Sequence, residues 1–529
     1  MGHELVVGVD VGTTSARAGV YDRAGRLLGR GQHPILMNRP SPEHAEHSSQ
    51  DIWRAVATAV RAAMAAAEAP ADAVRGISFD ATCSLVVLDA AGNPVDVSSG
   101  EDPSWDTIVW LDHRAVAEAE ACSASGHRVL DFIGGVMSPE METPKLMWLK
   151  RHKPESWARA GLFLDLADFL TYRASGSRAR SVCTVTCKWT YLAHETPGWQ
   201  RDFFAAMGVD DLLERGGLPP TATPIGTDLG PLLPEAAAAL GLTTATRVGC
   251  GLIDAHAGAL GVLGGLGQEA PAELDRHLGL IGGTSSCHMA LSAEPRAVPG
   301  VWGPYLGAVL PGYWLNEGGQ SVTGALLDHV LQLHSAGGAA DAALHAKVVG
   351  RIAELRAAEG PRFAEGLHVL PDFHGNRSPL ADPHATGVIS GLTLDRSFDG
   401  LCRLYYRTAV AIVLGTRHIV DALNAKGYRI DTLHLTGGHV KNPLLVELYA
   451  DATNCRLVLP ETEDAVLLGT AMVAAAAAGL HEDLPTACAA MAPSGRERLP
   501  EPEAAQRFAR DYRAFLLMHE QRRALERVT

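Results

Sequence analysis

Residues 5–21 read LVVGVDVGTTSARAGVY, and this stretch decides the fold. Its small and branched apolar residues predict a buried strand over Leu5–Asp10 and a second strand over Ala16–Tyr21. The turn between them, Gly12–Ser15, offers bare backbone N–H groups and hydroxyls at a strand end. Such a concavity suits phosphate oxygens. The stretch therefore predicts a phosphate-binding hairpin at the start of an α/β chain.

Polar side chains surround this first turn. Asp10 ends the first strand, where a carboxylate can hold Mg²⁺ through water, and Arg17 leaves the turn, where it can point at phosphate. The candidate phosphate ligands of the turn itself are Thr13, Thr14 and Ser15.

The turn recurs in the second half of the chain. Residues 280–286, LIGGTSS, repeat the pattern of residues 9–15, VDVGTTS, and add Gly282, Gly283 and Thr284 as candidate phosphate ligands. Two such turns can hold one polyphosphate from both sides. Taken singly, each is equally well an ordinary hairpin, but the repeat favours two related lobes that face each other across a cleft.

Strand-like and helix-like segments alternate along the chain, which is typical of the α/β class. The glycine-rich stretch 258–267 and the polar segment after it suggest a boundary between a first lobe, residues 1–267, and a second, residues 268–529. The apolar run Ala465–Leu480 is too short for a membrane span and predicts a buried helix. Glu501–Arg523 predicts an amphipathic helix that packs back on the body.

Composition excludes several classes. The chain has 529 residues, a net charge of −15 and no concentration of basic residues, so nucleic-acid and anionic-membrane binding are disfavoured. No leader peptide is expected before the first strand. Nine scattered cysteines do not suggest a disulfide framework, and a reducing cytosol fits best. A homodimer is the commonest default for such a chain.

Asp254 is the candidate catalytic residue. It follows a strand-like run and precedes small residues that allow close approach, so it can accept a proton from an attacking hydroxyl. A helix N-cap aspartate is the equally weighted alternative. His256 is expected to orient other groups or to be structural. Cys183 and Cys187 lack a second cysteine pair, so no metal site is expected there.

Two further places are candidate cleft residues. Gly437 and Gly438 follow a predicted strand, Thr432–Leu435, where bare backbone can pack on adenine or ribose, with Asn442 nearby. Trp110 is expected to line the cleft because a polar segment follows it. Neither a Walker motif nor a dinucleotide-binding motif is present.

These motifs together resemble the FGGY carbohydrate kinases, whose fold is shared with actin and hexokinase. The resemblance runs from about residue 5 to residue 480 and rests on Asp10–Ser15, Trp110–Arg114, Lys145–Leu149, Gly251–Gly258, Gly282–Ser285, Gly375–Pro379 and Thr436–Gly438. It implies a two-lobed kinase fold with duplicated sheet-and-helix domains around a central cleft, which binds ATP, Mg²⁺ and a sugar.

Within the family the chain resembles the ribulokinase branch, on residues 80–84, 181–189, 316–321 and 415–417. That likeness implies sugar contacts from Lys188, Asp254 and Glu317. It also implies that Asp254 serves as the general base. The further sugar-site residues expected are Ala81, Thr82, Trp110, Asp112 and His113. Ala81, where L-ribulokinases more often have Phe, points to D-ribulose. Glu142 stands where the family usually has a small residue or Pro.

The resemblance implies a kinase for the 5-hydroxyl of D-ribulose. L-ribulose, a xylulose and ribitol stay open as substrates, because hydroxyl stereochemistry depends on sub-ångström placement. An idle ATP- and sugar-binding regulator is the alternative from another class.

Overall fold

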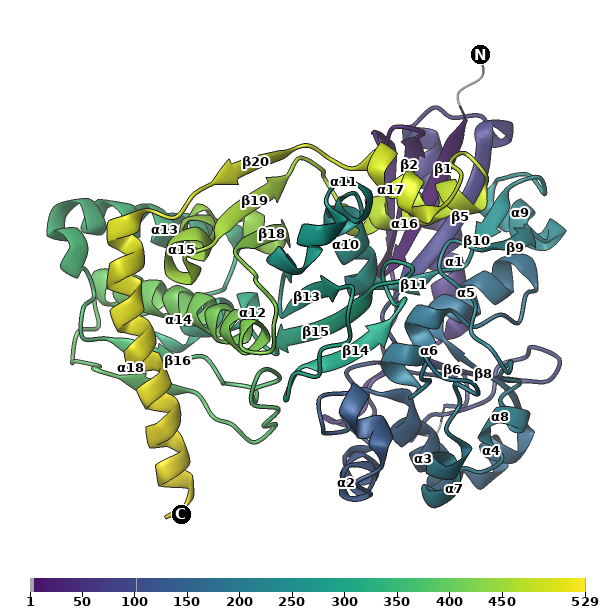
Figure 1. Ribbon diagram of the computed structural model, residues 1–529, viewed down its shortest axis with the longest axis horizontal. Coiled ribbons are helices and arrows are strands. Elements are labelled where there is room, and N and C mark those ends of the chain that lie inside the picture. Colours follow the sequence, from purple (N-terminus) through teal and green to yellow (C-terminus); the bar gives the residue numbers. More distant parts are fainter. Residues whose placement is uncertain (1–3, 101, 529) are drawn as a thin grey trace.

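The computed structural model describes residues 4–100 and 102–528 and has two lobes (Figure 1). A mixed sheet forms the centre of the first lobe, in the order β3-β2-β1-β5-β10-β9, with β11 paired to β5. Its strands are β1 (Leu5–Val11), β2 (Ser15–Asp22), β3 (Leu27–Pro34), β5 (Val74–Ala81), β9 (Asp228–Pro231), β10 (Arg247–Gly249) and β11 (Leu252–Ile253).

The second lobe repeats this topology. Its sheet runs β14-β15-β13-β12-β18-β19-β20, and β12 pairs antiparallel with β13 and parallel with β18, as β1 does with β2 and β5. The duplicated two-lobed fold that the two turns predicted is therefore confirmed. The strands are β12 (His277–Gly282), β13 (Ser286–Ser292), β14 (Trp302–Leu306), β15 (Trp314–Gln320), β18 (Thr432–Gly437), β19 (Arg456–Pro460) and β20 (Gly495–Arg498).

Smaller elements complete each lobe. A second sheet of the first lobe has the order β4-β7-β6-β8, and a short ribbon, β16 with β17, lies in the second lobe. These strands are β4 (Glu46–His47), β6 (Leu85–Asp89), β7 (Thr107–Ile108), β8 (Ala160–Asp165), β16 (His368–Leu370) and β17 (Val388–Ser390).

Helices cover the sheets and carry several site residues. In the first half they are α1 (Ser49–Ala66), α2 (Val116–Ala124), α3 (Glu142–His152), α4 (Pro154–Arg159), α5 (Leu166–Ser175), α6 (Val182–Lys188), α7 (Arg201–Ala206), α8 (Leu212–Arg215), α9 (Pro234–Leu240), α10 (Asp254–Leu263) and α11 (Leu266–Glu269). In the second half they are α12 (Gly324–Leu333), α13 (Ala342–Glu359), α14 (Phe398–Asn424), α15 (Pro443–Thr453), α16 (Ala465–Ala477), α17 (Leu484–Met491) and α18 (Pro502–Glu526).

Helices α10 and α16 cross between the lobes. α10 packs on β12 of the second sheet, whereas α16 returns to β1 and β5 of the first, as the yellow ribbon beside the purple strands shows (Figure 1). The glycine-rich stretch 258–267 is therefore mostly helix α10 and not a linker. Its glycines let the two helices approach, because a Cβ on Gly261 would lie 2.1 Å from Ala465 O. The lobe boundary at residues 267/268 stays a prediction.

We expect Gly469→Ala to destabilise the protein through this crossing. The added Cβ would lie 2.0 Å from the backbone oxygen of Ala257, so the helices must separate. Overpacking of this kind costs about 1–3 kcal/mol in the free energy of unfolding, measurable by urea titration. Gly350→Ala in α13 is the control: nothing lies within 4 Å of its Cβ, so it should be neutral or stabilising. Equal effects of the two changes would contradict this interpretation.

The other two helix predictions hold. α16 is buried along nearly its whole length, as predicted for Ala465–Leu480. α18 packs on α15 and α14, its Phe508, Tyr512 and Phe515 are buried, and the last two contact His418 of α14. Within residues 4–100 and 102–528, none of the helices combines the length and the hydropathy needed to cross a membrane.

Candidate active site

Three carboxylates lie at the ends of adjacent strands of the first sheet. β1, β5 and β11 are parallel neighbours, with Asp10 beside Asp80 and Ile253 beside Ala81 in the register. Asp254 follows β11 directly as the first residue of α10. The carboxyl ends of parallel strands are where α/β sheets place ligand sites. The strand register thus brings Asp10, Asp80 and Asp254 to one edge.

Burial shifts the titration of all three acids. Asp10 and Asp80 are fully buried, and the pKa of Asp10 rises to about 7 because burial and the Asp254 charge outweigh the attraction of Arg17. Burial and Asp10 raise the pKa of Asp80 well above its usual range. Burial also raises the pKa of Asp254, although the hydrogen bond of 2.7 Å from Ala255 N to Asp254 Oδ1 acts to lower it. A carboxylate with a raised pKa is a stronger general base.

Arg17 links this cluster to α16. Its guanidinium pairs with Asp10, and its Nη1 lies 3.7 Å from Asp464 Oδ2. Asp464 also caps α16, and Thr470 of that helix donates a hydrogen bond to Asp80. The sequence analysis missed Asp80 and Asp464. Asp80 ends a predicted strand beside the first one, a signal that was available, whereas nothing local marks Asp464.

The two glycine turns are closed in a similar way but differ in length by one residue. Gly12 N donates to Ser15 O at 3.1 Å across the turn 12–15, and Gly283 N donates to Ser285 O at 2.8 Å across the turn 283–285. Each turn exposes one threonine, Thr14 in the first and Thr284 in the second. Trp110 Nε1 donates to Thr13 Oγ1 at 2.9 Å, which places the tryptophan against the first turn, and Ser15 Oγ accepts from Gln32 at 3.2 Å.

The third glycine turn adjoins the second. Gly282 and Gly437 are paired residues of β12 and β18, and a Cβ on Gly437 would lie 2.4 Å from Gly282 O. His439 Nε2 lies 3.0 Å from Gly283 O, and Gly438 directly precedes this histidine at the start of a short 3-10 turn. Asn442 caps α15 and donates to Tyr405 Oη at 3.3 Å. The turns therefore form one continuous glycine surface.

A buried ion pair connects the lobes at the predicted sugar site. Lys188 Nζ of α6 lies 3.9 Å from Glu317 Oε2 of β15, and it stacks 4.1 Å above the ring of Trp302. Burial opposes both charges, but Lys188 and His256 outweigh it and lower the pKa of Glu317 to about 2, while Glu317 raises the pKa of Lys188. Both groups are therefore charged at neutral pH.

A second bridge between the lobes lies beside it. Arg377 Nη2 donates to Glu140 Oε1 at 3.0 Å, and its guanidinium lies 5.5 Å from the ring of Trp302. The sequence analysis quoted Arg377 only within a motif and missed Trp302 and Glu140. Nothing in the sequence pairs residues 237 positions apart.

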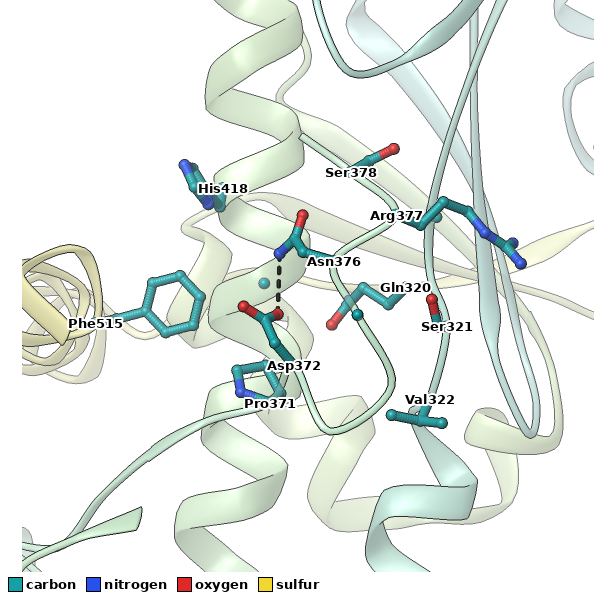
Figure 2. A pocket seen from close by; sticks show the side chains of 13 residues that line it. Gln320, Ser321, Val322, Pro371, Asp372, Asn376, Arg377, Ser378, His418 and Phe515 are labelled. Atoms are coloured by element: carbon teal, nitrogen blue, oxygen red, sulfur yellow. Dashed lines mark hydrogen bonds between the residues drawn. The ribbon is translucent and has the colours of Figure 1, made fainter. Parts of the chain in front are cut away.

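The pocket behind Arg377 is structural. Figure 2 shows Asn376 donating a hydrogen bond to Asp372. The Oδ1 atom of Asn376 also accepts a hydrogen bond from Leu380 N. The cavity measures about 10 Å³, roughly the space of one water molecule. This cavity is too small for a sugar. The hydrogen bonds of Asn376 beside it hold the loop that carries Arg377.

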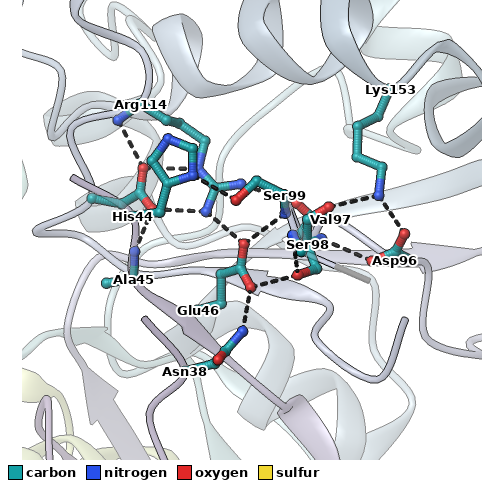
Figure 3. A network of polar contacts seen from close by, with 12 residues as sticks. Asn38, His44, Ala45, Glu46, Asp96, Val97, Ser98, Ser99, Arg114 and Lys153 are labelled. Carbon is teal, nitrogen blue, oxygen red and sulfur yellow. Dashed lines mark hydrogen bonds and ion pairs between the residues drawn. The ribbon is translucent and has the colours of Figure 1, made fainter. Parts of the chain in front are cut away.

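The remaining predicted sugar-site residues fall in two groups. Ala81 ends β5 at the acid edge and Thr82 follows it, where Thr82 N donates to Val11 O. His113 lies across from His374 of the second lobe, with ring centroids 6.4 Å apart. Asp112, in contrast, is buried and accepts from Ala45 N and from Arg114, whose guanidinium also reaches Glu46 in the network of Figure 3. Its carboxylate is occupied by internal partners.

Glu142 gives a prediction about pH. It is fully buried 3.7 Å from Lys145 Nζ, and burial raises its pKa from 4.5 to about 7. A raised folded-state pKa contributes stability that is fully present below pH 4.5 and is lost as pH rises through about 7. Glu142→Gln should therefore flatten the fall of unfolding free energy over this window by up to about 3 kcal/mol. Exposed Glu120→Gln is the charge-matched control, and an unchanged pH slope in Glu142→Gln would contradict the assignment.

Comparison with known proteins decides the family. The model of the N-terminal domain of the FGGY family of carbohydrate kinases matches residues 5–261, and that of the C-terminal domain matches residues 278–478. The chain belongs to the FGGY family of carbohydrate kinases. It is a sugar kinase, a phosphotransferase with an alcohol acceptor, and kinases of this family use ATP as the phosphate donor.

Relatives of this FGGY kinase cover nearly its whole length. An FGGY carbohydrate kinase domain-containing protein of Danio rerio is 44% identical, over 98% of both chains. A D-ribulokinase of Saccharomyces cerevisiae is 36% identical, over 90% of this chain and 72% of its own. A xylulose kinase from Rhodospirillum rubrum superposes with a TM-score of 0.79 at 24% identity, over 98% of this chain and 99% of its own, which supports the fold. The ribulokinase likeness read from the motifs is confirmed.

Proposed function

We propose that this FGGY kinase transfers the γ-phosphoryl group of ATP to the 5-hydroxyl of D-ribulose, with Asp254 as the general base. The observation that carries the proposal is the surroundings of Asp254, whose charge acts on the acids Asp10 and Asp80 and which itself feels the charge of Glu317, the partner of Lys188. The 36% identity to a D-ribulokinase supports the choice of sugar.

The two glycine turns would hold the phosphates of ATP. Thr13, Thr14, Ser15 and Arg17 act from the first lobe, and Gly282, Gly283 and Thr284 act from the second. Gly437 and Gly438, which are exposed beside Gly282, would offer bare backbone to adenosine, with Asn442 nearby in the chain. Phosphoryl transfer needs mainly such positioning and charge stabilisation.

Mg²⁺ fits at Asp10. Both carboxylate oxygens of Asp10 are buried, and the partner recorded for them is the Arg17 guanidinium, a cation, so the site already favours positive charge. The acids do not form a closed cage, in keeping with an ion that keeps waters and phosphate oxygens as ligands. When bound, Mg²⁺ would neutralise charge on the β- and γ-phosphates. Arg17, which now pairs with Asp10, would be free to turn to phosphate.

Asp254 would take the proton of the attacking hydroxyl. The sugar oxygen then forms its bond to the γ-phosphorus while the bond from phosphorus to the β–γ bridging oxygen breaks, and ADP leaves. Lys188 and Glu317 would hold other sugar hydroxyls, as donor and acceptor. Closure of the lobes would exclude water as a competing nucleophile, so ATP hydrolysis without sugar should be slow.

The test of this function is sugar-dependent ADP release with Mg-ATP. We expect D-ribulose to give the largest kcat/KM among D-ribulose, L-ribulose, D-xylulose, L-xylulose and ribitol. A larger value for another sugar would replace the substrate but keep the base. Binding of ATP and sugars without turnover would favour a regulator. A homodimer in the cytosol is our further expectation, and sedimentation tests the dimer.

A further inference from the structure

Beside the sugar site lies a second group of reactive side chains: Cys183, Cys187 and His256. The cysteines are one turn apart on α6 and so share a face, and His256 lies in the first turn of α10. Their ligand atoms all lie within 4.8 Å of one another, and all three side chains are fully buried. Among the residues that the structure describes, no other group of three His, Cys, Asp or Glu side chains is so close.

Neighbouring groups orient these ligands. Cys183 Sγ lies 3.1 Å from His256 Nδ1 and accepts a hydrogen bond from Ile253 N at 3.4 Å. His256 Nε2 lies 3.2 Å from Glu317 Oε2. With the Nε2 proton donated to Glu317, the Nδ1 lone pair faces the sulfur. A carboxylate on the far nitrogen is the usual partner of a metal-bound imidazole.

We propose that one divalent cation that prefers sulfur and nitrogen ligands, such as Zn²⁺, is bound by Cys183, Cys187 and His256. Two thiolates and an imidazole favour Zn²⁺ over Mg²⁺, which prefers oxygen ligands and would stay at Asp10. Two Zn–S bonds and one Zn–N bond form, the two thiol protons leave to solvent, and water fills the fourth position.

The separations suit this ion. Zn–S bonds of about 2.3 Å and Zn–N bonds of about 2.1 Å put a sulfur and a nitrogen about 3.6 Å apart around a tetrahedral ion. Cys183 Sγ and His256 Nδ1, now 3.1 Å apart, need to move by only a fraction of an ångström. The kinase reaction uses none of these three groups. The third ligand is 73 positions from Cys183, which is why the cysteine pair alone gave no metal signal.

Cd²⁺, a soft ion with a thiolate charge-transfer absorption, tests the site in the reduced, metal-free full-length protein. We expect the Cd²⁺–thiolate absorption to saturate at one equivalent of Cd²⁺ per protein chain. Added Zn²⁺ should displace Cd²⁺ and abolish the absorption, whereas added Mg²⁺ should leave it unchanged. It should be lost in Cys183→Ser and in Cys187→Ser, and kept in Cys402→Ser, which changes a buried cysteine of α14. Saturable absorption that persists in the folded Cys183→Ser variant would overturn the proposal.

A second measurement needs no variant. X-ray absorption of the wild-type protein loaded with one equivalent of Zn²⁺ should show two sulfur ligands at about 2.3 Å and an imidazole nitrogen. A first shell of oxygen and nitrogen alone would overturn the proposal, even if a serine variant failed to fold. Neither measurement depends on phosphoryl transfer. Both therefore test the metal site independently of the proposed sugar substrate.

Discussion

Asp254→Asn is expected to lower kcat by about 10²–10⁴-fold while the affinity for the sugar stays near that of the wild type. The amide has the same shape and keeps the end of β11 in place, but it cannot take the hydroxyl proton. Because the shape at the sugar is kept, the expected loss is confined to the chemical step, although the change also removes a negative charge that raises the pKa of Asp10. Sugar affinity by calorimetry and kcat by ADP release together separate the two effects.

The matched control is Asp72→Asn, the same chemical change at an exposed residue just before β5, at the opposite end of that strand from Asp80. It should leave both quantities unchanged. If Asp254→Asn kept most of its kcat, another group would be the base. The raised pKa of Asp254 adds a second expectation: kcat of the wild type falls as pH drops through that pKa, because the protonated acid cannot accept a proton.

Lys188→Met is expected to damage both stability and sugar binding. It leaves the buried carboxylate of Glu317 without its main cation, a loss that typically costs about 3–5 kcal/mol of unfolding free energy. It also removes a charged hydrogen-bond donor for sugar hydroxyls, worth about 1.5–3 kcal/mol, so KM for the sugar should rise by about 10–100-fold. Urea unfolding and steady-state kinetics measure the two effects.

A double variant separates these roles. Lys188→Met with Glu317→Gln removes the uncompensated charge, so much of the stability should return while sugar binding stays poor. Exposed Lys426→Met is the control for loss of a lysine charge. Recovery of sugar binding in the double variant would show that Lys188 acts only by neutralising Glu317.

The local strand and turn signals proved reliable. The strand predicted at Leu5–Asp10 is β1, and the one predicted at Thr432–Leu435 is β18, each within two residues of its observed ends. Such elements depend on periodicity and turn chemistry within a few residues. The glycines of residues 258–263 lie in α10, where they allow a close helix crossing; glycine marks both loops and such crossings, and only the position of α16 tells them apart.

By itself, then, the sequence determined the duplicated α/β fold, the two glycine turns and the family, since each rests on residues adjacent in the chain. Tertiary structure alone decided that Asp80 joins Asp10, that Glu140 reaches Arg377, and that His256 completes the cysteine pair. These contacts join strands and lobes that are far apart in sequence. Their partners are set by sheet register and by the packing of α10 against α16, which no local pattern encodes.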